Sequence, residues 1–146
     1  MTLLPFVANA CFFLCRDLHD SYGERGLRIL LFPCNQFGSQ EPGSNQTIAN
    51  FVEDKLEDKA GAAGRAFDLY EKLEVNGQGE TPIYTWCKSR AVGIMGTTSV
   101  KWNFTKFIVQ RDGISVQRFS PTTSPASLAS DIERALEDHR EPPGKQ

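Results

Sequence analysis

The chain has 146 residues, a formal net charge of −2 and 40% hydrophobic residues. That length and apolar content suit one domain with a packed core, so we expect a single domain over residues 1–138 and a disordered polar tail over 139–146. No run of Lys or Arg exceeds two residues, which excludes a nucleic-acid partner. The sequence also lacks the stretch of about 20 apolar residues that membrane insertion requires.

Four cysteines stand at scattered spacings: Cys11, Cys15, Cys34 and Cys87. A small secreted domain would carry a denser disulfide framework, so we expect reduced thiols and a cytoplasmic location. The first fifteen residues are apolar but lack a positively charged start, which argues against a signal peptide. Cys11, Cys15 and His19 would share one helix face, yet a structural zinc site needs a fourth ligand that is not evident, so we expect no metal.

The first half of the chain predicts a parallel β-α-β unit. Residues 3–10 are an apolar strand, residues 12–22 have helical spacing, and residues 27–32 are a buried strand. A strand, helix and strand in that order imply a right-handed crossover. Residues 33–43 then form a Pro- and Gly-rich loop, and Ser44 or Asn45 begins a helix.

The second half predicts a hairpin between two helices. Residues 57–65 are small and charged, as in an exposed insertion, and residues 67–73 are a short apolar stretch before an Asn76-Gly77 turn. Pro82 opens a helix to about Arg90. The strands 104–109 and 114–119 flank Asp112-Gly113, and Ser124-Pro125 starts a C-terminal helix.

Three sequence blocks resemble the signatures of the glutathione peroxidase family. Residues 32–38 read FPCNQFG, residues 40–43 read QEPG and residues 101–107 read KWNFTKF. The likeness covers most of the chain from about residue 14 onward, in family order. The resemblance implies an α/β, thioredoxin-like fold in which helices flank a central mixed β-sheet, with a shortened N-terminal part.

The resemblance also implies a reactive cysteine or selenocysteine surrounded by a Gln, a Trp and an Asn. The matching positions are Gln40, Trp102 and Asn103. A thiolate attacks the peroxide oxygen, and neutral N–H donors from amides and an indole stabilise that thiolate and lower the pKa of the thiol. The same donors can stabilise negative charge on the leaving oxygen.

Cys11 is the predicted nucleophile. It follows an apolar strand, as in the family motif V-A-S-x-C-G-x-T, and precedes a helix whose dipole favours thiolate. The match departs from the family where Asn9 replaces Ser and Phe12 replaces Gly, and several residues are missing before the helix. Two other interpretations stay open: a buried structural thiol, or a mispredicted or alternatively spliced N-terminus.

The resemblance predicts a thiol peroxidase that reduces hydrogen peroxide or organic and lipid hydroperoxides and protects against oxidative stress. Cys34 is a structural thiol with a possible redox role, and no resolving cysteine follows QEPG, so glutathione or another small thiol is the expected co-substrate. No other cofactor is expected. The chain has no long insertion between Gly77 and Trp102, which implies a monomer. The alternative is a catalytically impaired scaffold that acts as a binding or redox-regulatory protein.

Overall fold

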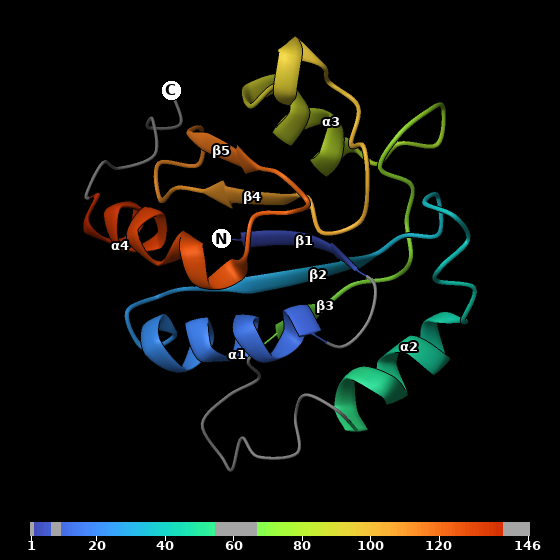
Figure 1. Ribbon diagram of the computed structural model, residues 1–146, viewed down its shortest axis with the longest axis horizontal. Coiled ribbons are helices and arrows are strands. Elements are labelled where there is room, and N and C mark those ends of the chain that lie inside the picture. Colours follow the sequence, from blue (N-terminus) through green and yellow to red (C-terminus); the bar gives the residue numbers. More distant parts are fainter. Residues whose placement is uncertain (1, 7–9, 55–66, 139–146) are drawn as a thin grey trace, which may run out of the picture.

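The computed structural model describes residues 2–6, 10–54 and 67–138 (Figure 1). Within these ranges the chain alternates strands and helices around one sheet. The elements in chain order are β1 Thr2–Phe6, α1 Ala10–Tyr22, β2 Ile29–Pro33, α2 Asn45–Val52, β3 Phe67–Leu69, α3 Pro82–Arg90, the 3₁₀ turn η2 Ile94–Gly96, β4 Lys106–Val109, β5 Val116–Phe119, the 3₁₀ turn η3 Pro125–Leu128 and α4 Ala129–Glu137.

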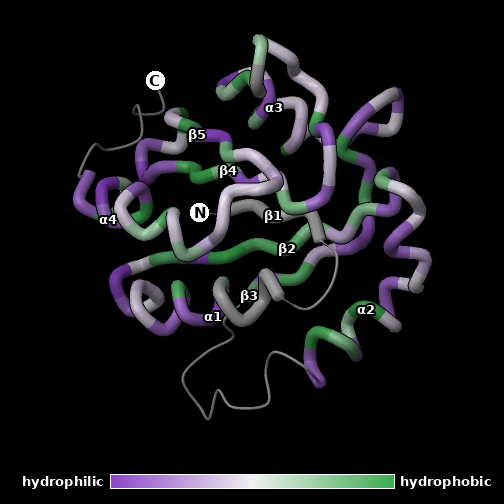
Figure 2. The backbone as a smooth tube through the Cα atoms, viewed as in Figure 1, coloured by the Kyte–Doolittle hydropathy of each residue, from purple (hydrophilic) through white to green (hydrophobic). Residues whose placement is uncertain are grey.

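The sheet has the strand order β3-β2-β1-β4-β5 and is mixed. β1 and β3 run parallel to β2, whereas β4 runs antiparallel to both β1 and β5. All five residues of β2 are buried, because this strand is covered on both faces and therefore reads as a continuous apolar run (Figure 2). The predicted parallel β-α-β unit and the mixed sheet flanked by helices are confirmed.

Alternate residues of β2 point into two different cores. Ile29 and Leu31 pack with apolar residues of α1, α2 and α4, whereas Leu30 and Phe32 pack with residues of α3 and β4. Figure 1 shows the same layers, with α1 and α4 on one side of the sheet and α3 on the other. The fold is therefore three-layered, with β2 as its most buried element.

The predicted hairpin is confirmed, with both strands starting later than expected, β4 at Lys106 and β5 at Val116. Val109 pairs with Val116, and Gly113 takes a positive φ of 68° in the connecting turn. Phe104 has a φ of 62°, which is left-handed backbone that a strand cannot accommodate. Pairing therefore begins at Lys106 and not at residue 104.

Other boundaries also differ from the prediction. α1 begins at Ala10, β2 begins at Ile29 after a turn in which Gly26 has a φ of 103°, and β3 ends at Leu69. The C-terminal helix begins with the 3₁₀ turn η3 before α4. Residues 7–9 of the predicted first strand, the expected insertion over 57–65 and the expected tail over 139–146 lie outside the described residues, whereas Ala10, predicted as strand, belongs to α1. Among the residues that are described, no helix has the length and apolar character to cross a membrane.

We predict that Leu31→Ala destabilises the protein by about 2–5 kcal/mol, because it opens a cavity in the core beneath β2. Leu31 is fully buried in the cluster that α1, α2 and α4 share. Urea unfolding followed by circular dichroism measures the change. Ile114→Ala is the control, since Ile114 is 42% exposed and its loss should cost less than about 0.5 kcal/mol. Equal effects of the two substitutions would contradict this account of the core.

Candidate active site

Two segments that are distant in the sequence meet through a pair of amide side chains. Asn103 Nδ2 donates a hydrogen bond of 2.9 Å to Gln40 Oε1. Asn103 is only 1% exposed, and its Oδ1 has no hydrogen-bond partner among the described residues. Because the Gln40 oxygen accepts from Asn103, the Gln40 amide N–H groups remain available as donors.

Trp102 lies beside this amide pair. The residue is 49% exposed, and its ring lies 6.0 Å, centroid to centroid, from the ring of Phe37. Gly38 lies next to both groups: a Cβ added there would be in ordinary van der Waals contact with Gln40 Cγ at 3.6 Å and with Trp102 Cη2 at 3.7 Å. The structure therefore brings Gln40, Trp102 and Asn103 together: Gln40 bonds to Asn103 and lies with Trp102 beside Gly38.

The loop that carries Gln40 is held in a specific conformation. Asn35 Oδ1 accepts a hydrogen bond of 2.9 Å from the Glu41 N–H. The ammonium group of Lys72 donates to the carbonyl oxygens of Glu41 and Gly43. Ser39 has a φ of 51°, a left-handed conformation that is uncommon for a residue with a side chain. These contacts fix the position of Gln40 before any ligand binds.

The described cysteine side chains are all buried. Cys34 donates its S–H to Gln36 Oε1 at 3.7 Å, and burial raises the pKa of its thiol. Burial raises the pKa of Cys87 to about 12, and Cys15 packs in the core with α4. Cys34 and Cys87 are therefore neutral thiols near pH 7, which is the environment of structural cysteines.

Cys11 lies in the first turn of α1, whose bounds are Ala10–Tyr22. Its backbone is thus at a helix N-terminus, one residue inside the helix and not ahead of it as the sequence predicted. Its side chain lies outside what the structure describes. Within the described residues, no group of three or more His, Cys, Asp or Glu side chains is arranged to hold a metal ion.

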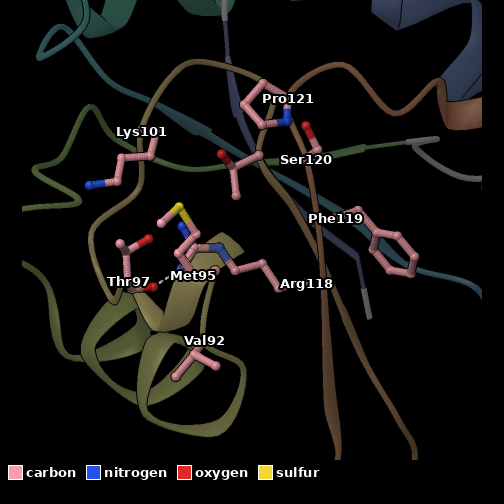
Figure 3. A pocket seen from close by; sticks show the side chains of 10 residues that line it. Val92, Met95, Thr97, Lys101, Arg118, Phe119, Ser120 and Pro121 are labelled. Atoms are coloured by element: carbon pink, nitrogen blue, oxygen red, sulfur yellow. Dashed lines mark hydrogen bonds between the residues drawn. The ribbon is translucent and has the colours of Figure 1, made fainter.

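A pocket of about 330 Å³ lies beside the segment that carries Trp102 and Asn103 (Figure 3). Its wall is formed by the segment after α3, by the residues flanking Trp102–Phe104, and by β5 with the turn that follows. The lining residues are Val92, Gly93, Met95, Thr97, Lys101, Thr105, Arg118, Phe119, Ser120 and Pro121. Figure 3 shows the Arg118 guanidinium beside Met95 and Thr97, and Lys101 at the margin of the pocket with its ammonium directed away from the other lining side chains, so positive charge borders apolar surface.

Arg118 is a charged residue of this wall that sequence reasoning missed. Its guanidinium donates to the carbonyl oxygens of Thr98 at 3.0 Å and Ser99 at 2.8 Å, and lies 5.5 Å from the centroid of the Phe107 ring. Burial lowers the pKa of Arg118, and no carboxylate among the described residues forms an ion pair with it. In the sequence Arg118 is only one residue of the predicted hairpin, and no motif around it indicates that it lines a pocket.

Comparisons with known proteins point to one family. The sequence profile described as glutathione peroxidase matches residues 6–88. The chain is 44% identical over 119 residues to a probable phospholipid hydroperoxide glutathione peroxidase of Mesembryanthemum crystallinum, covering 82% of this chain and 65% of that protein. It is 40% identical over 151 residues to the glutathione peroxidase homolog BsaA of Bacillus subtilis (strain 168), covering 94% of this chain and 90% of that protein.

Solved structures agree with the sequence comparisons. The apo form of Trgpx matches with a TM-score of 0.71 and 26% identity, covering 94% of this chain and 80% of that one. The GPX1 of T. cruzi matches with a TM-score of 0.68 and 26% identity, covering 95% of this chain and 82% of that one. These matches confirm the family resemblance and the α/β, thioredoxin-like fold that the sequence predicted.

We predict that Cys87 resists alkylation in the folded protein. With a pKa of about 12, its thiolate fraction at neutral pH is far below that of an unfolded cysteine, whose pKa is about 8.5. Iodoacetamide should label Cys87 more than about a hundredfold more slowly than a free model thiol. Peptide mapping by mass spectrometry gives the rate, and labelling in concentrated urea is the control. Equal rates in the folded and unfolded protein would contradict the prediction.

Proposed function

Because the chain belongs to the glutathione peroxidase family, we propose that it is a thiol peroxidase that reduces hydrogen peroxide or organic hydroperoxides and protects against oxidative stress. Its reductant is glutathione or another small thiol. The observation that carries the proposal is the hydrogen bond between Asn103 and Gln40, with Trp102 beside it. The bond joins two amides and leaves the Trp102 indole next to them. These three groups suit the stabilisation of a thiolate and of a departing oxygen anion.

The proposed nucleophile is Cys11, and the sheet topology supports this choice. β1 ends at Phe6, next to Pro33 at the end of β2, and α1 begins at Ala10. β4 runs antiparallel to β1, with Leu3 opposite Phe107, so the residues before Lys106 lie toward the same edge of the sheet. Three segments therefore lie at the same end of the sheet, where β1 and β2 finish: the first turn of α1, the Gln40 loop and the Trp102–Asn103 segment.

The burial of the other cysteines also favours Cys11. Raised thiol pKa values at Cys34 and Cys87 make both poor nucleophiles near neutral pH. Cys34 has a structural role in this proposal and at most a secondary redox role. At the first turn of a helix, in contrast, the helix dipole favours a thiolate.

The proposed reaction has two stages. The Cys11 thiolate attacks one peroxide oxygen, forming an S–O bond and breaking the O–O bond, and the leaving oxygen takes a proton to become water or an alcohol. The resulting sulfenic acid is attacked by a first thiol, which gives water and a mixed disulfide. A second thiol then displaces the cysteine, releasing the disulfide of the reductant and restoring Cys11. No metal or organic cofactor takes part.

We further propose that lipid hydroperoxides are substrates. The pocket of Figure 3 supports this, since Val92 and Met95 offer apolar surface next to the cations Lys101 and Arg118. An acyl chain with an anionic head would complement both features. The relative from Mesembryanthemum crystallinum is named for phospholipid hydroperoxide, which agrees with this substrate class.

The proposed protein is a cytoplasmic monomer. Scattered cysteines suit a reducing compartment. The segment between Gly77 and Trp102 lacks the extra loop that tetrameric members of the family carry. In a monomer, the end of the sheet next to the loops of Gln40 and Asn103 would be open to bulky substrates.

We predict that Cys11→Ser abolishes hydroperoxide reduction, because a hydroxyl is not ionised at neutral pH. Gln40→Ala should lower kcat/KM by about a hundredfold, the typical effect of removing one preorganised donor. A coupled assay with hydrogen peroxide and glutathione measures both. Gln46→Ala is the matched control, since Gln46 bonds only to Asn50 on the exposed face of α2. Full activity of Cys11→Ser would overturn the assignment of the nucleophile.

We predict that Lys101→Glu lowers kcat/KM for a fatty-acid hydroperoxide roughly fivefold more than it lowers kcat/KM for hydrogen peroxide, because a surface charge pair contributes about 1 kcal/mol. Arg134→Glu makes the same charge change on α4, outside the pocket, and should affect both substrates equally. An identical loss on both substrates in Lys101→Glu would contradict the assignment of the pocket to the lipid.

A further inference from the structure

Asn76 makes more hydrogen bonds than its predicted place in a turn requires. Its backbone N–H donates to Gln36 Oε1 at 3.1 Å, and its carbonyl oxygen accepts from Gln36 Nε2 at 2.8 Å. Its side chain pairs on the other side, where Nδ2 donates to the Val100 carbonyl at 2.8 Å and Oδ1 accepts from the Val100 N–H at 2.9 Å. Asn76 therefore has a two-point connection to each of two neighbours.

These two neighbours belong to the two halves of the candidate active site. Gln36 lies in the loop that carries Gln40, and Val100 lies directly before the Lys101–Asn103 segment. Asn76 thus links the same two segments that meet at the hydrogen bond between Asn103 and Gln40. The hydrogen bond between Asn103 and Gln40 joins two side chains, whereas the Asn76 side chain bonds to the backbone of the second segment at Val100.

Lys88 fixes the orientation of the Asn76 amide. Its ammonium group donates to Asn76 Oδ1 at 3.2 Å and to the Val75 carbonyl at 2.9 Å, and it pairs with Glu80. An ammonium group is only a donor, so the atom that faces it must be the amide oxygen. Lys88 is 6% exposed, and an ion pair that is so well shielded holds its partners firmly. The Asn76 amide therefore cannot rotate without breaking three contacts.

We infer that Asn76 is a positioning residue, which sets the distance at which the Gln40 loop and the Trp102–Asn103 segment meet. The inference rests on the proposed function in its link to thiol activation. Asn76 does not touch the reacting atoms and is not a catalytic residue in this scheme. Hydrogen bonds weaken steeply as their geometry departs from the optimum, so a shift of Val100 by a fraction of an ångström would weaken the bond between Asn103 and Gln40.

The first test measures position without any activity. The chain has two tryptophans, so Trp86→Phe leaves Trp102 as the only one and its fluorescence reports the site. In that background, Asn76→Ala should raise the constant for acrylamide quenching of Trp102 about twofold, as the ring loses its support against Phe37. Arg111→Ala is the control, because it removes a side-chain bond to the backbone of a distant segment, at Arg25, away from the candidate active site, and should leave Trp102 quenching unchanged.

The second test measures thiol activation. Asn76→Ala should shift the midpoint of the pH profile for Cys11 alkylation upward by about one unit, as misplaced donors stabilise the thiolate less. The kcat/KM for hydrogen peroxide should fall about tenfold in the same variant. Asn76→Asp keeps the acceptor for Lys88 and for the Val100 N–H, but a carboxylate oxygen replaces the donor and repels the Val100 carbonyl. It should therefore shift all three readouts in the same direction as Asn76→Ala.

The outcomes separate the inference from the proposed function. If Asn76→Ala folds but keeps wild-type quenching and a wild-type pH profile, the inference is overturned and Asn76 is only structural. If Asn76→Ala does not fold, Asn76→Asp decides by the same readouts, and wild-type values in it overturn the inference. If the unmodified protein reduces no hydroperoxide, the proposed function fails, while the quenching measurements still decide whether Asn76 positions the site.

Discussion

The burial of β2 on both faces is the constraint on which the rest of the structure depends. Its neighbours in the sheet are both parallel to it, and its alternate side chains complete two separate cores. A strand covered on both sides must be apolar throughout, so it carries no reactive group itself. Polar chemistry can begin only where the strand ends, and there the chain runs from Pro33 into the loop of Gln40.

The reversed direction of β4 completes the candidate active site. If β4 ran parallel to β1, the residues before it would emerge at the opposite end of the sheet. Because it is antiparallel, Asn103 and Trp102 emerge at the edge where β1 and β2 finish. The positive φ of Phe104 then turns the chain from that edge into β4. The contact between Asn103 and Gln40 thus follows from the sheet topology, and local hydrogen bonds only refine it.

Sequence patterns predicted what depends on periodicity or on a motif. The continuous apolar run of β2, the Asp112-Gly113 hairpin and Pro82 at the start of α3 are local signals, and each one appears in the structure. The sequence carried no such signal for Arg118 or for the contacts of Asn76, where it predicted only the turn with Gly77. Their contacts join residues far apart in the chain, and a single arginine or a turn asparagine looks the same in the sequence whether or not those contacts exist.

The proposed site relies on neutral amides, and this choice has a physical reason. A lysine in place of Gln40 or Asn103 would stabilise a thiolate by charge, but it would also bind anions and compete for protons. Amides supply directional N–H groups whose effect depends on position rather than on ionisation, so their benefit is lost when they move. Such a site needs a rigid frame, and the charged groups Lys72 and Lys88 serve that frame by binding backbone carbonyls away from the amide pair. The charged side chains therefore hold the loops in place, and the position of those loops sets how well the amides can stabilise a thiolate.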